Sequence, residues 1–354
     1  MSYFLEFSFI LAFILSISII VFFFFKDFYG NWDGMRIINT ATKFIFWGKE
    51  NWLDLFKLNT PLSRSDYPLM IPMIVGKAWT YAKNISPLEP AVISALYTYG
   101  SVFLLVTSIC KFKNYNCGIL AGIFLLFTAP FIVNGAAEYS DIPLSFYILA
   151  AFIMIVFFNK NKDEKYLIFA GLSSGLACWT KNEGLFFSFL LIISLLISTF
   201  FNKIPYKKLL KFLYGYLPVL AIIILYKILL CPPNDLLQGQ TTGILLTKIT
   251  DINRYILVIK ALWANIHELC LDYKTFFVFI LFLMISGIKV NDNNKFEVII
   301  ILLTIILLFL SDITMYLITP HEIMWQVSNS IYRLITHIIP SLYLIGFIIT
   351  KECL

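Results

Sequence analysis

The chain has 354 residues, of which 60% are hydrophobic and only 14% are charged. Apolar stretches recur along its whole length, so the composition excludes a water-soluble globular protein. The formal net charge of +6 arises mostly from lysines in short loops, where they orient membrane helices, and it implies no nucleic-acid partner.

The apolar stretches predict an all-α, polytopic integral membrane protein with a single transmembrane domain over residues 1–354. The hydrocarbon core of a bilayer is about 30 Å thick, and a helix needs roughly 20 residues to cross it. We expect about ten spanning helices, near residues 4–25, 87–110, 117–133, 142–159, 166–180, 184–201, 209–230, 275–289, 297–312 and 334–350. The first stretch lacks a basic n-region and a cleavage site, so it is predicted to be an uncleaved anchor.

Lysines predict the orientation of these helices. With ten helices, one side of the membrane receives all the lysine-rich turns, at residues 111–113, 160–165, 203–211 and 289–295. Basic short loops stay in the cytoplasm, so both termini are predicted to be cytoplasmic. The first loop, residues 26–86, and the last loop, residues 313–333, then lie outside the cytoplasm.

The first outer loop is predicted to lie along the membrane surface. Residues 35–47 can form a helix, and the stretch NWLDLFKL at residues 51–58 can form a second one with an apolar face. Trp47 and Trp52 in these helices are typical of aromatic anchors at the interface, and stacking on a sugar ring is the alternative.

Three aspartates on the outer side stand next to predicted helices. Asp33 precedes the helix over residues 35–47, and Asp66 in DYP and Asp141 in DIP each stand two residues before a proline. An acid before a helix, or a proline in its first turn, is typical of a helix start. Capping alone would therefore explain each of these acids taken singly.

The stretch AAEYSDIP at residues 136–143 places Glu138 and Asp141 between long apolar runs. Ionisable groups near membrane depth are costly and tend to mark substrate paths or sites. If the turn is helical, the spacing of three residues puts both carboxylates on one face. Together they are therefore candidates for a substrate path or site.

A second polar turn ends the short apolar run LIFAGLSSGLACWTKNEGLFF, residues 167–187. Gly171 and Gly175 are typical of close packing between membrane helices. Lys181 is either a cation that snorkels to the interface and pairs with Glu183, or a ligand of a site.

The last outer segment, PHEIMWQVSNSIYRLITHIIP at residues 320–340, carries His321, Arg333 and His337. The spacing of the histidines fits no zinc motif. The guanidinium of Arg333 has the planar shape that binds phosphate oxygens. Cys231 and Cys270 are the two cysteines that could meet outside, although their spacing does not establish a disulfide.

Four segments together resemble the GT-C glycosyltransferases: NWDGMRIINTATKFIFWGKENW…SRSDYPLMIPMIVGKAW, AAEYSDIPLSFYILAAF, AGLSSGLACWTKNEGLFF and WQVSNSIYRLITHIIP. The order of these segments is similar to that in bacterial members of the protein O-mannosyltransferase and aminoarabinose transferase superfamily. The resemblance implies an inverting transfer of a sugar from a polyprenyl-phosphate donor to a lipid, glycan or protein acceptor. It also implies a bacterial inner-membrane protein whose site faces away from the cytoplasm.

The resemblance implies roles for particular residues. Asp33 is the expected catalytic carboxylate. The expected ligands of sugar, acceptor or a divalent cation such as Mg²⁺ or Mn²⁺ are Glu138, Asp141 and Asp66. The expected phosphate ligands are Lys181, Arg333, Arg64 and Arg36, and the expected sugar-stacking rings are Trp32, Tyr67 and Trp325. These residue types suit the chemistry, because a carboxylate can accept the proton of an acceptor hydroxyl and cations can stabilise a departing phosphate.

Departures from the family pattern keep other functions open. Many relatives have Glu where this chain has Gly34, and the branch it resembles tends to have His in place of Gln326 and Asp in place of Tyr332. A non-catalytic subunit with the same fold is therefore one alternative. A transporter or flippase of a lipid-linked saccharide is the other, although such proteins often show internal repeats and polar groups at mid-membrane.

Overall fold

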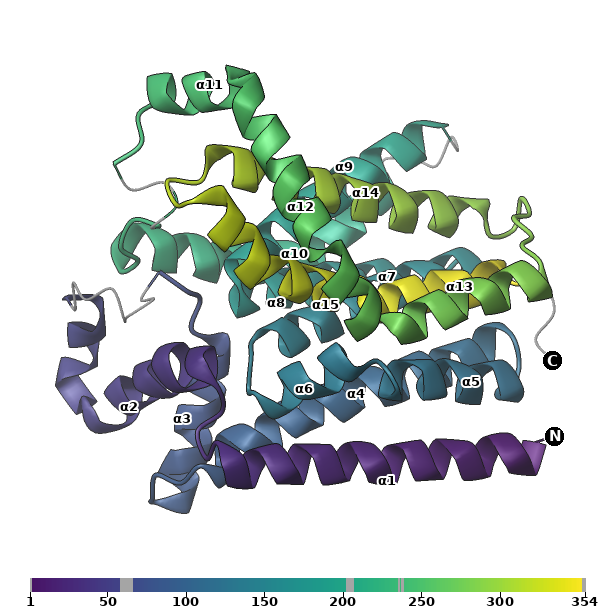
Figure 1. The fold of residues 1–354 in the computed structure, drawn as a ribbon, viewed down its shortest axis with the longest axis horizontal. Coiled ribbons are helices and arrows are strands. Elements are labelled where there is room, and N and C mark those ends of the chain that lie inside the picture. Colours follow the sequence, from purple (N-terminus) through teal and green to yellow (C-terminus); the bar gives the residue numbers. More distant parts are fainter. Residues whose placement is uncertain (1, 58–65, 202–206, 235, 237–238, 352–354) are drawn as a thin grey trace.

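The structure is a computed structural model that describes residues 2–57, 66–201, 207–234, 236 and 239–351. These residues form helices joined by turns, with two isolated bridges and no strand (Figure 1). In chain order the helices are α1 (Ser2–Lys26), the π-helix η1 (Gly34–Asn39), α2 (Thr40–Trp47), the 3-10 helix η2 (Lys49–Lys57), α3 (Met70–Ala82), α4 (Leu88–Phe112), α5 (Tyr115–Leu126), α6 (Ala129–Ala136), α7 (Asp141–Asn161) and α8 (Lys165–Thr180). They continue with α9 (Asn182–Phe201), α10 (Lys207–Leu229), α11 (Thr242–Thr250), α12 (Ile252–Asp272), α13 (Lys274–Ser286), α14 (Lys295–Ile318) and α15 (Ile323–Ile349). The predicted all-α class is confirmed.

Every predicted span coincides with a helix or a bent pair of helices. Within the described residues, seven helices are long and apolar enough to cross a membrane, and two bent pairs raise this number to nine. The remaining predicted span, α8, has 16 residues. The count of ten therefore stays a prediction.

The predicted single helix over residues 117–133 is wrong, because α5 and α6 meet at a bend of 63°. Pro130 lies in the first turn of α6. Proline has no N–H to donate to the preceding turn, so it suits the start of a helix and disrupts its interior. A second bend, of 76°, separates α12 from α13.

The start of α1, the end of α15 and the lysine-bearing turns at residues 111–113, 160–165 and 289–295 lie at one end of the bundle (Figure 1). The predicted lysine-rich turn at residues 203–211 lies partly outside the described residues. The Nζ of Lys113 donates to the main-chain oxygen of Thr350 at 2.7 Å, and the Nζ of Lys160 donates to that of Lys111 at 2.8 Å. Ile288 forms a bridge with Thr350. We call this end of the molecule the lysine end. The first loop and the start of α7 lie at the opposite end.

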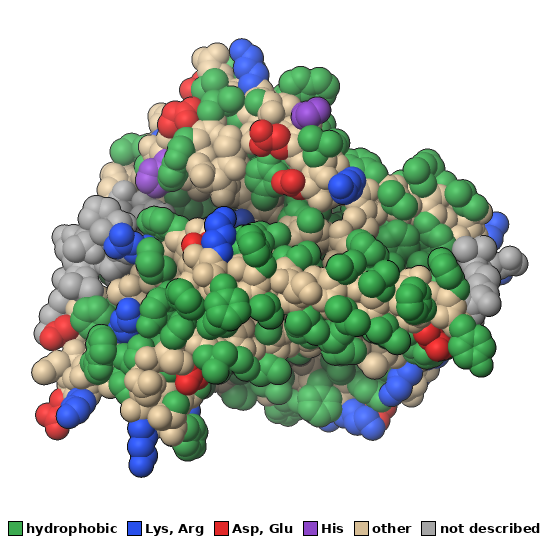
Figure 2. All heavy atoms as spheres, turned by 60° about the horizontal axis from the view of Figure 1, so that its bottom comes forward, with side chains coloured by type: hydrophobic (Ala, Val, Ile, Leu, Met, Phe, Trp, Pro, Cys, Tyr) green, Lys and Arg blue, Asp and Glu red, His purple; other side chains and the backbone are tan. Residues whose placement is uncertain are grey.

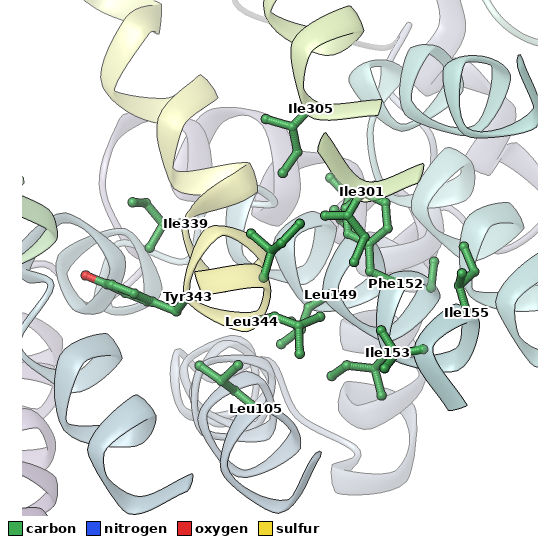
Figure 3. Close-up of a cluster of buried hydrophobic side chains, with 14 of the residues drawn as sticks. Leu105, Leu149, Phe152, Ile153, Ile155, Ile301, Ile305, Ile339, Tyr343 and Leu344 are labelled. Carbon is green, nitrogen blue, oxygen red and sulfur yellow. The ribbon is translucent and has the colours of Figure 1, made fainter. Parts of the chain in front are cut away.

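The core surrounds α7, which packs against α4, α8 and α15. Leu149 and Phe152 of α7 meet Leu105 of α4, Ile301 of α14 and Tyr343 of α15 in this core (Figure 3). A helix with neighbours on all sides is apolar all round. A polar residue in its first turn is consequently buried, and this is where Asp141 stands.

Glycines bring α8 and α10 into close contact, as predicted for Gly171 and Gly175. A Cβ at Gly171 would overlap the main-chain oxygen of Phe212, and a Cβ at Gly215 would overlap that of Ile168. Backbones this close allow extensive van der Waals contact between membrane helices. The packing fixes the end of α8, and with it the turn that carries Lys181.

The segments predicted to lie outside the cytoplasm are more helical than expected. The helix predicted over residues 35–47 is confirmed as η1 and α2, and the one predicted over residues 51–58 is confirmed as η2 up to Lys57, the last described residue before the gap. Helix α3 adds a further helix to the first loop. Residues 313–333 do not form a loop, because α14 continues to Ile318 and α15 begins at Ile323. The outer segment before them contains α11 and α12.

The surface matches a membrane environment. Hydrophobic side chains cover most of the middle of the face in Figure 2, and charged side chains lie mainly toward its margins. On α1, large apolar side chains such as Phe4, Phe7 and Phe22 are more than half exposed. An apolar surface this broad is typical of a protein that faces lipid.

Candidate active site

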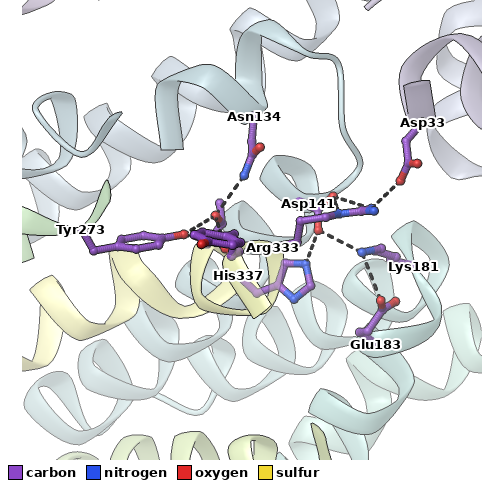
Figure 4. A network of polar contacts seen from close by, with 10 residues as sticks. Asp33, Asn134, Asp141, Lys181, Glu183, Tyr273, Arg333 and His337 are labelled. Atoms are coloured by element: carbon purple, nitrogen blue, oxygen red, sulfur yellow. Dashed lines mark hydrogen bonds and ion pairs between the residues drawn. The ribbon is translucent and has the colours of Figure 1, made fainter. Parts of the chain in front are cut away.

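Asp141, at the start of α7, is the centre of a buried polar cluster (Figure 4). Its Oδ1 accepts a hydrogen bond from the Nζ of Lys181 at 2.9 Å and lies 2.6 Å from the Nε2 of His337. Its Oδ2 lies 3.2 Å from Nε and 3.0 Å from Nη2 of Arg333. Three basic side chains, from the α8–α9 turn and from α15, thus converge on one carboxylate.

This arrangement suits a charged carboxylate in the interior. Asp141 is 0% exposed, and a buried charge is tolerated only when it is paired and hydrogen-bonded. Its place in the first turn of α7 also favours a negative charge, because the amino end of a helix is positive. Capping, the alternative explanation of this acid, does not apply, since Ser140 is the N-cap residue and the Asp141 oxygens bind other helices.

Arg333 connects this cluster to the first loop. Its Nη2 also lies 2.5 Å from Oδ2 of Asp33, and its guanidinium lies over the ring of Tyr139 at 4.9 Å. Asp33 occupies the N-cap position of η1 but makes no side-chain cap bond, so capping, the alternative explanation, does not account for its carboxylate. The expected catalytic carboxylate and an expected phosphate ligand are therefore in direct contact.

Lys181 lies inside the protein and does not snorkel. Its side chain is 3% exposed, and its Nζ also contacts Oε1 of Glu183 at 3.1 Å, so the pairing expected for a snorkelling lysine forms inside the protein. Burial disfavours the charged form, but the carboxylates of Asp141 and Glu183 outweigh burial and raise the pKa of Lys181. Lys181 is therefore a permanent cation beside Asp141.

A second set of hydrogen bonds fixes the rotation of α15. The hydroxyl of Thr336 receives a bond from Nδ2 of Asn134 at 3.0 Å and contacts the hydroxyl of Tyr273 at 2.8 Å. Tyr273 also donates to the main-chain oxygen of Tyr332 at 2.6 Å. Because Thr336 lies on α15 between the two basic residues of the cluster, these bonds hold both of them toward Asp141.

Glu138 does not share a face with Asp141, because the turn between α6 and α7 is not helical. Glu138 has a positive φ of 60° and is 5% exposed. Its Oε2 accepts a hydrogen bond from Nδ2 of Asn39 in the first loop at 3.1 Å. Gly34 packs on the same turn, where a Cβ would lie 2.8 Å from the main-chain oxygen of Ala137.

Burial raises the pKa of Glu138 to about 8, although the Asn39 hydrogen bond acts in the opposite direction. An unfolded Glu titrates near pH 4.3, so between this pH and about pH 8 the folded protein holds a proton that the unfolded chain has lost. The stability that this proton supplies is present at low pH and is lost as the pH rises through 8.

We therefore expect the melting temperature of the wild type, measured in detergent, to fall relative to that of Glu138→Gln between pH 5 and pH 8. Gln has nearly the same shape and cannot ionise, so other titrating groups cancel in the comparison. A constant difference between the two melting temperatures over this range would contradict the assignment.

Asp66 belongs to a separate cluster. Its Oδ2 accepts hydrogen bonds from Asn182 at 3.1 Å and Asn234 at 2.7 Å. The Nζ of Lys227 donates to its main-chain oxygen at 2.7 Å. The helix that follows begins at Met70 without a side-chain cap, so the alternative explanation of Asp66 as a capping residue does not apply. Its hydrogen bonds instead tie the first loop to α9 and α10.

The other expected ligands lie at the edge of the cluster. Arg36 is exposed and lines a pocket with Tyr67 and Ser140 between the first loop and α7. Burial and the nearby charge of Glu183 raise the pKa of Tyr67. The proposed stacking residues Trp32 and Trp325 are 46% and 54% exposed. Arg64 lies outside the described residues.

The described residues contain no group of three His, Cys, Asp or Glu side chains that could hold a metal ion. Asp141 already has a basic partner at each oxygen, and Glu138 faces an amide. The predicted use of these two acids for a divalent cation therefore does not fit. Cys231 and Cys270 are both free thiols, so they do not form a disulfide.

Two members of the cluster, His337 and Tyr139, were not predicted as site residues. A sequence signal exists for the first: His337 follows Arg333 by four residues, so both occupy one face of a helix. For Tyr139 the signal is its place between two acids in AAEYSDIP, but no pattern predicts that its ring meets Arg333 from another helix.

The fold defines a polytopic α-helical membrane protein, and the cluster around Asp141 is its candidate active site. The structure is similar to that of ArnT from Cupriavidus metallidurans bound to undecaprenyl phosphate, with a TM-score of 0.50 and 10% sequence identity, covering 94% of this chain and 59% of that chain. At this identity the similarity concerns the fold alone, and the chain spans about three fifths of the length of ArnT.

The sequence agrees with this class. The model of the dolichyl-phosphate-mannose-protein mannosyltransferase family matches residues 58–231, a region that contains Asp66, Glu138, Asp141 and Lys181. No curated protein sequence matches the chain. The resemblance predicted from the sequence is confirmed: the chain has the ArnT-like GT-C fold, and its residues 58–231 match the model of this mannosyltransferase family.

Proposed function

We propose that the protein is an inverting glycosyltransferase that moves a sugar from a polyprenyl-phosphate donor to an acceptor hydroxyl. One observation carries the proposal: a buried carboxylate, Asp141, gathers Lys181, Arg333 and His337 beside the less buried Asp33. The site thus combines an acid that can accept a proton with cations that can bind a phosphate. The bound undecaprenyl phosphate of ArnT and the matched mannosyltransferase segment support this class of donor.

The proposed reaction uses few protein groups. The carboxylate of Asp33 takes the proton of the acceptor hydroxyl while that oxygen bonds to the anomeric carbon. The bond from this carbon to the phosphate oxygen breaks, and the polyprenyl phosphate leaves with the electron pair. Arg333 and Lys181 stabilise the negative charge on the leaving phosphate in a site from which water is largely excluded.

The lysine end supports a site on the outer side of the membrane. Its lysines remain in the cytoplasm by the positive-inside tendency. Helix α7 carries Lys160 of the lysine end in its last turn and Asp141 in its first turn, so the Asp141 cluster lies toward the opposite end of the bundle. Nucleotide sugars are absent outside the cytoplasm, so the sugar must arrive on a lipid. A lipid, glycan or protein on that side can then serve as acceptor.

Native mass spectrometry of the gently purified protein tests donor binding. We expect a bound polyprenyl phosphate or its sugar-charged form, and we expect Lys181→Ala to lose it, because this substitution removes a buried cation beside Asp141 and Glu183. Lys165→Ala is the matched control, since the Lys165 side chain is 59% exposed and forms its ion pair with the exposed Asp163 at the lysine end. If no such lipid binds, even after polyprenyl-phosphate sugars are added, the flippase of another saccharide or the non-catalytic subunit becomes the better proposal.

A further inference from the structure

The guanidinium of Arg333 has most of its hydrogen-bonding positions occupied in this structure. Nε and Nη2 bind Asp141, and Nη2 also contacts Asp33 at 2.5 Å. Tyr139 covers one face of the group. Nη1 makes no hydrogen bond to any residue that the structure describes. The edge of the guanidinium formed by Nη1 and Nη2 therefore contacts Asp33 at Nη2 and has no hydrogen-bond partner at Nη1 among these residues.

The two acids bound to Arg333 differ in how firmly they are held. Asp141 is 0% exposed and has Lys181 and His337 as further partners. The Asp33 side chain is 13% exposed, and Arg333 is its single side-chain partner among the described residues. Displacing Asp33 therefore breaks one contact at the edge of the cluster, whereas displacing Asp141 would break four in its interior.

An arginine binds a phosphate best through two parallel N–H donors. The Asp141 oxygen occupies the Nε side, so two donors are available to a phosphate only at Nη1 and Nη2, and Nη2 is the atom that contacts Asp33. A second anion close to Asp33 would also be repelled by it. A phosphate and Asp33 thus compete for the same edge of Arg333.

We infer that Arg333 exchanges Asp33 for the phosphate of the lipid donor, so that donor binding itself frees the Asp33 carboxylate. Without donor, the ion pair holds Asp33 away from any acceptor hydroxyl. When the phosphate takes the Nη1–Nη2 edge, Asp33 leaves and can accept a proton. This inference rests on the proposed function and adds to it a coupling between donor binding and activation of the base.

The coupling predicts an affinity change in an unusual direction. Because the apparent affinity is reduced by the fraction of protein whose site is blocked, removing the charge of Asp33 should tighten donor-lipid binding. An ion pair at the edge of a site contributes on the order of 1 kcal/mol, so we expect Asp33→Asn to bind undecaprenyl phosphate about fivefold more tightly than wild type. A residue that only supports the site would show the opposite change.

The experiment is a titration of the full-length protein in lipid nanodiscs with undecaprenyl phosphate, and with undecaprenol as the phosphate-free control ligand. Asp27→Asn removes an equal charge from the same loop at an exposed position and should bind like wild type. Asp33→Ser gives a second variant without the carboxylate. The affinity for undecaprenyl phosphate should increase in both Asp33 variants, whereas the affinity for undecaprenol should not change.

Unchanged or weaker binding of undecaprenyl phosphate by both Asp33 variants, with normal binding by the wild type, would overturn the inference and leave the proposed function standing. An equal gain in Asp27→Asn would overturn it too, because a general charge effect would then explain the change. If neither wild type nor variants bind the lipid phosphate, the proposed function fails together with the inference.

Discussion

Replacing Asp141 with Asn is expected to abolish sugar transfer and to lower the stability of the protein by about 3–5 kcal/mol, the range observed when one partner of a buried ion pair is removed. The carboxylate binds Lys181, Arg333 and His337 and is fully buried. A neutral amide leaves the two permanent cations short of negative charge and turns an N–H toward one of these donors. The melting temperature in detergent and the transfer rate of the same preparation measure both effects.

Asp163→Asn is the matched control for this prediction. Asp163 also pairs with a lysine, Lys165, at 2.8 Å, but its side chain is 42% exposed. Exposed pairs contribute roughly 0–1 kcal/mol, so this variant should melt close to wild type and retain transfer. If Asp141→Asn melts and transfers like Asp163→Asn, the buried cluster is not the centre of the site.

Replacing Asp33 with Asn should reduce the transfer rate by about 10²–10⁴-fold, the usual contribution of a general base, while the protein remains folded. Asp33 lies at the edge of the cluster and has one side-chain partner among the described residues, so its loss disturbs little packing. The rate is measured as release of bare lipid phosphate from a polyprenyl-phosphate sugar at saturating donor, with the melting temperature as a check on folding.

Asp27→Asn again serves as the control in the first loop, and its rate should equal that of the wild type. Retention of most of the transfer rate by Asp33→Asn would assign the proton transfer to another carboxylate. Loss of transfer together with a large fall in melting temperature would instead make Asp33 a structural residue.

Much of the fold follows from hydrophobicity and helix length. Each apolar run became a helix because a backbone in lipid must satisfy its own hydrogen bonds. The bend between α5 and α6 was missed because a proline in an apolar run can either begin a helix or kink it, and neighbouring helices decide between the two. The helix α3 was missed because its apolar run is short for a membrane span and contains Pro72; in the structure it packs around Trp79 with Ile38 of the first loop and Ile93 of α4.

The site was predictable where a residue type was improbable in its surroundings. Asp141, Lys181 and Arg333 are charged groups at the edges of apolar runs, and the structure brings them together. Their pairing was not predictable, because the partners of Asp141 lie 40 to 196 residues away in the chain. The prediction that Glu138 and Asp141 share one helix face was wrong. Glu138 has a positive φ, which interrupts the helix between the two residues, so their carboxylates contact different parts of the chain.

The measurement that tests the central claim most directly is turnover by the wild-type protein in nanodiscs with a panel of polyprenyl-phosphate sugars and cell-envelope lipid, glycan and protein acceptors. We predict that at least one donor is converted to bare polyprenyl phosphate with its sugar joined to an acceptor, and that Asp141→Asn does not catalyse this conversion. If the protein binds polyprenyl phosphate but leaves every donor in the panel intact, the claim that this cluster transfers a sugar is contradicted.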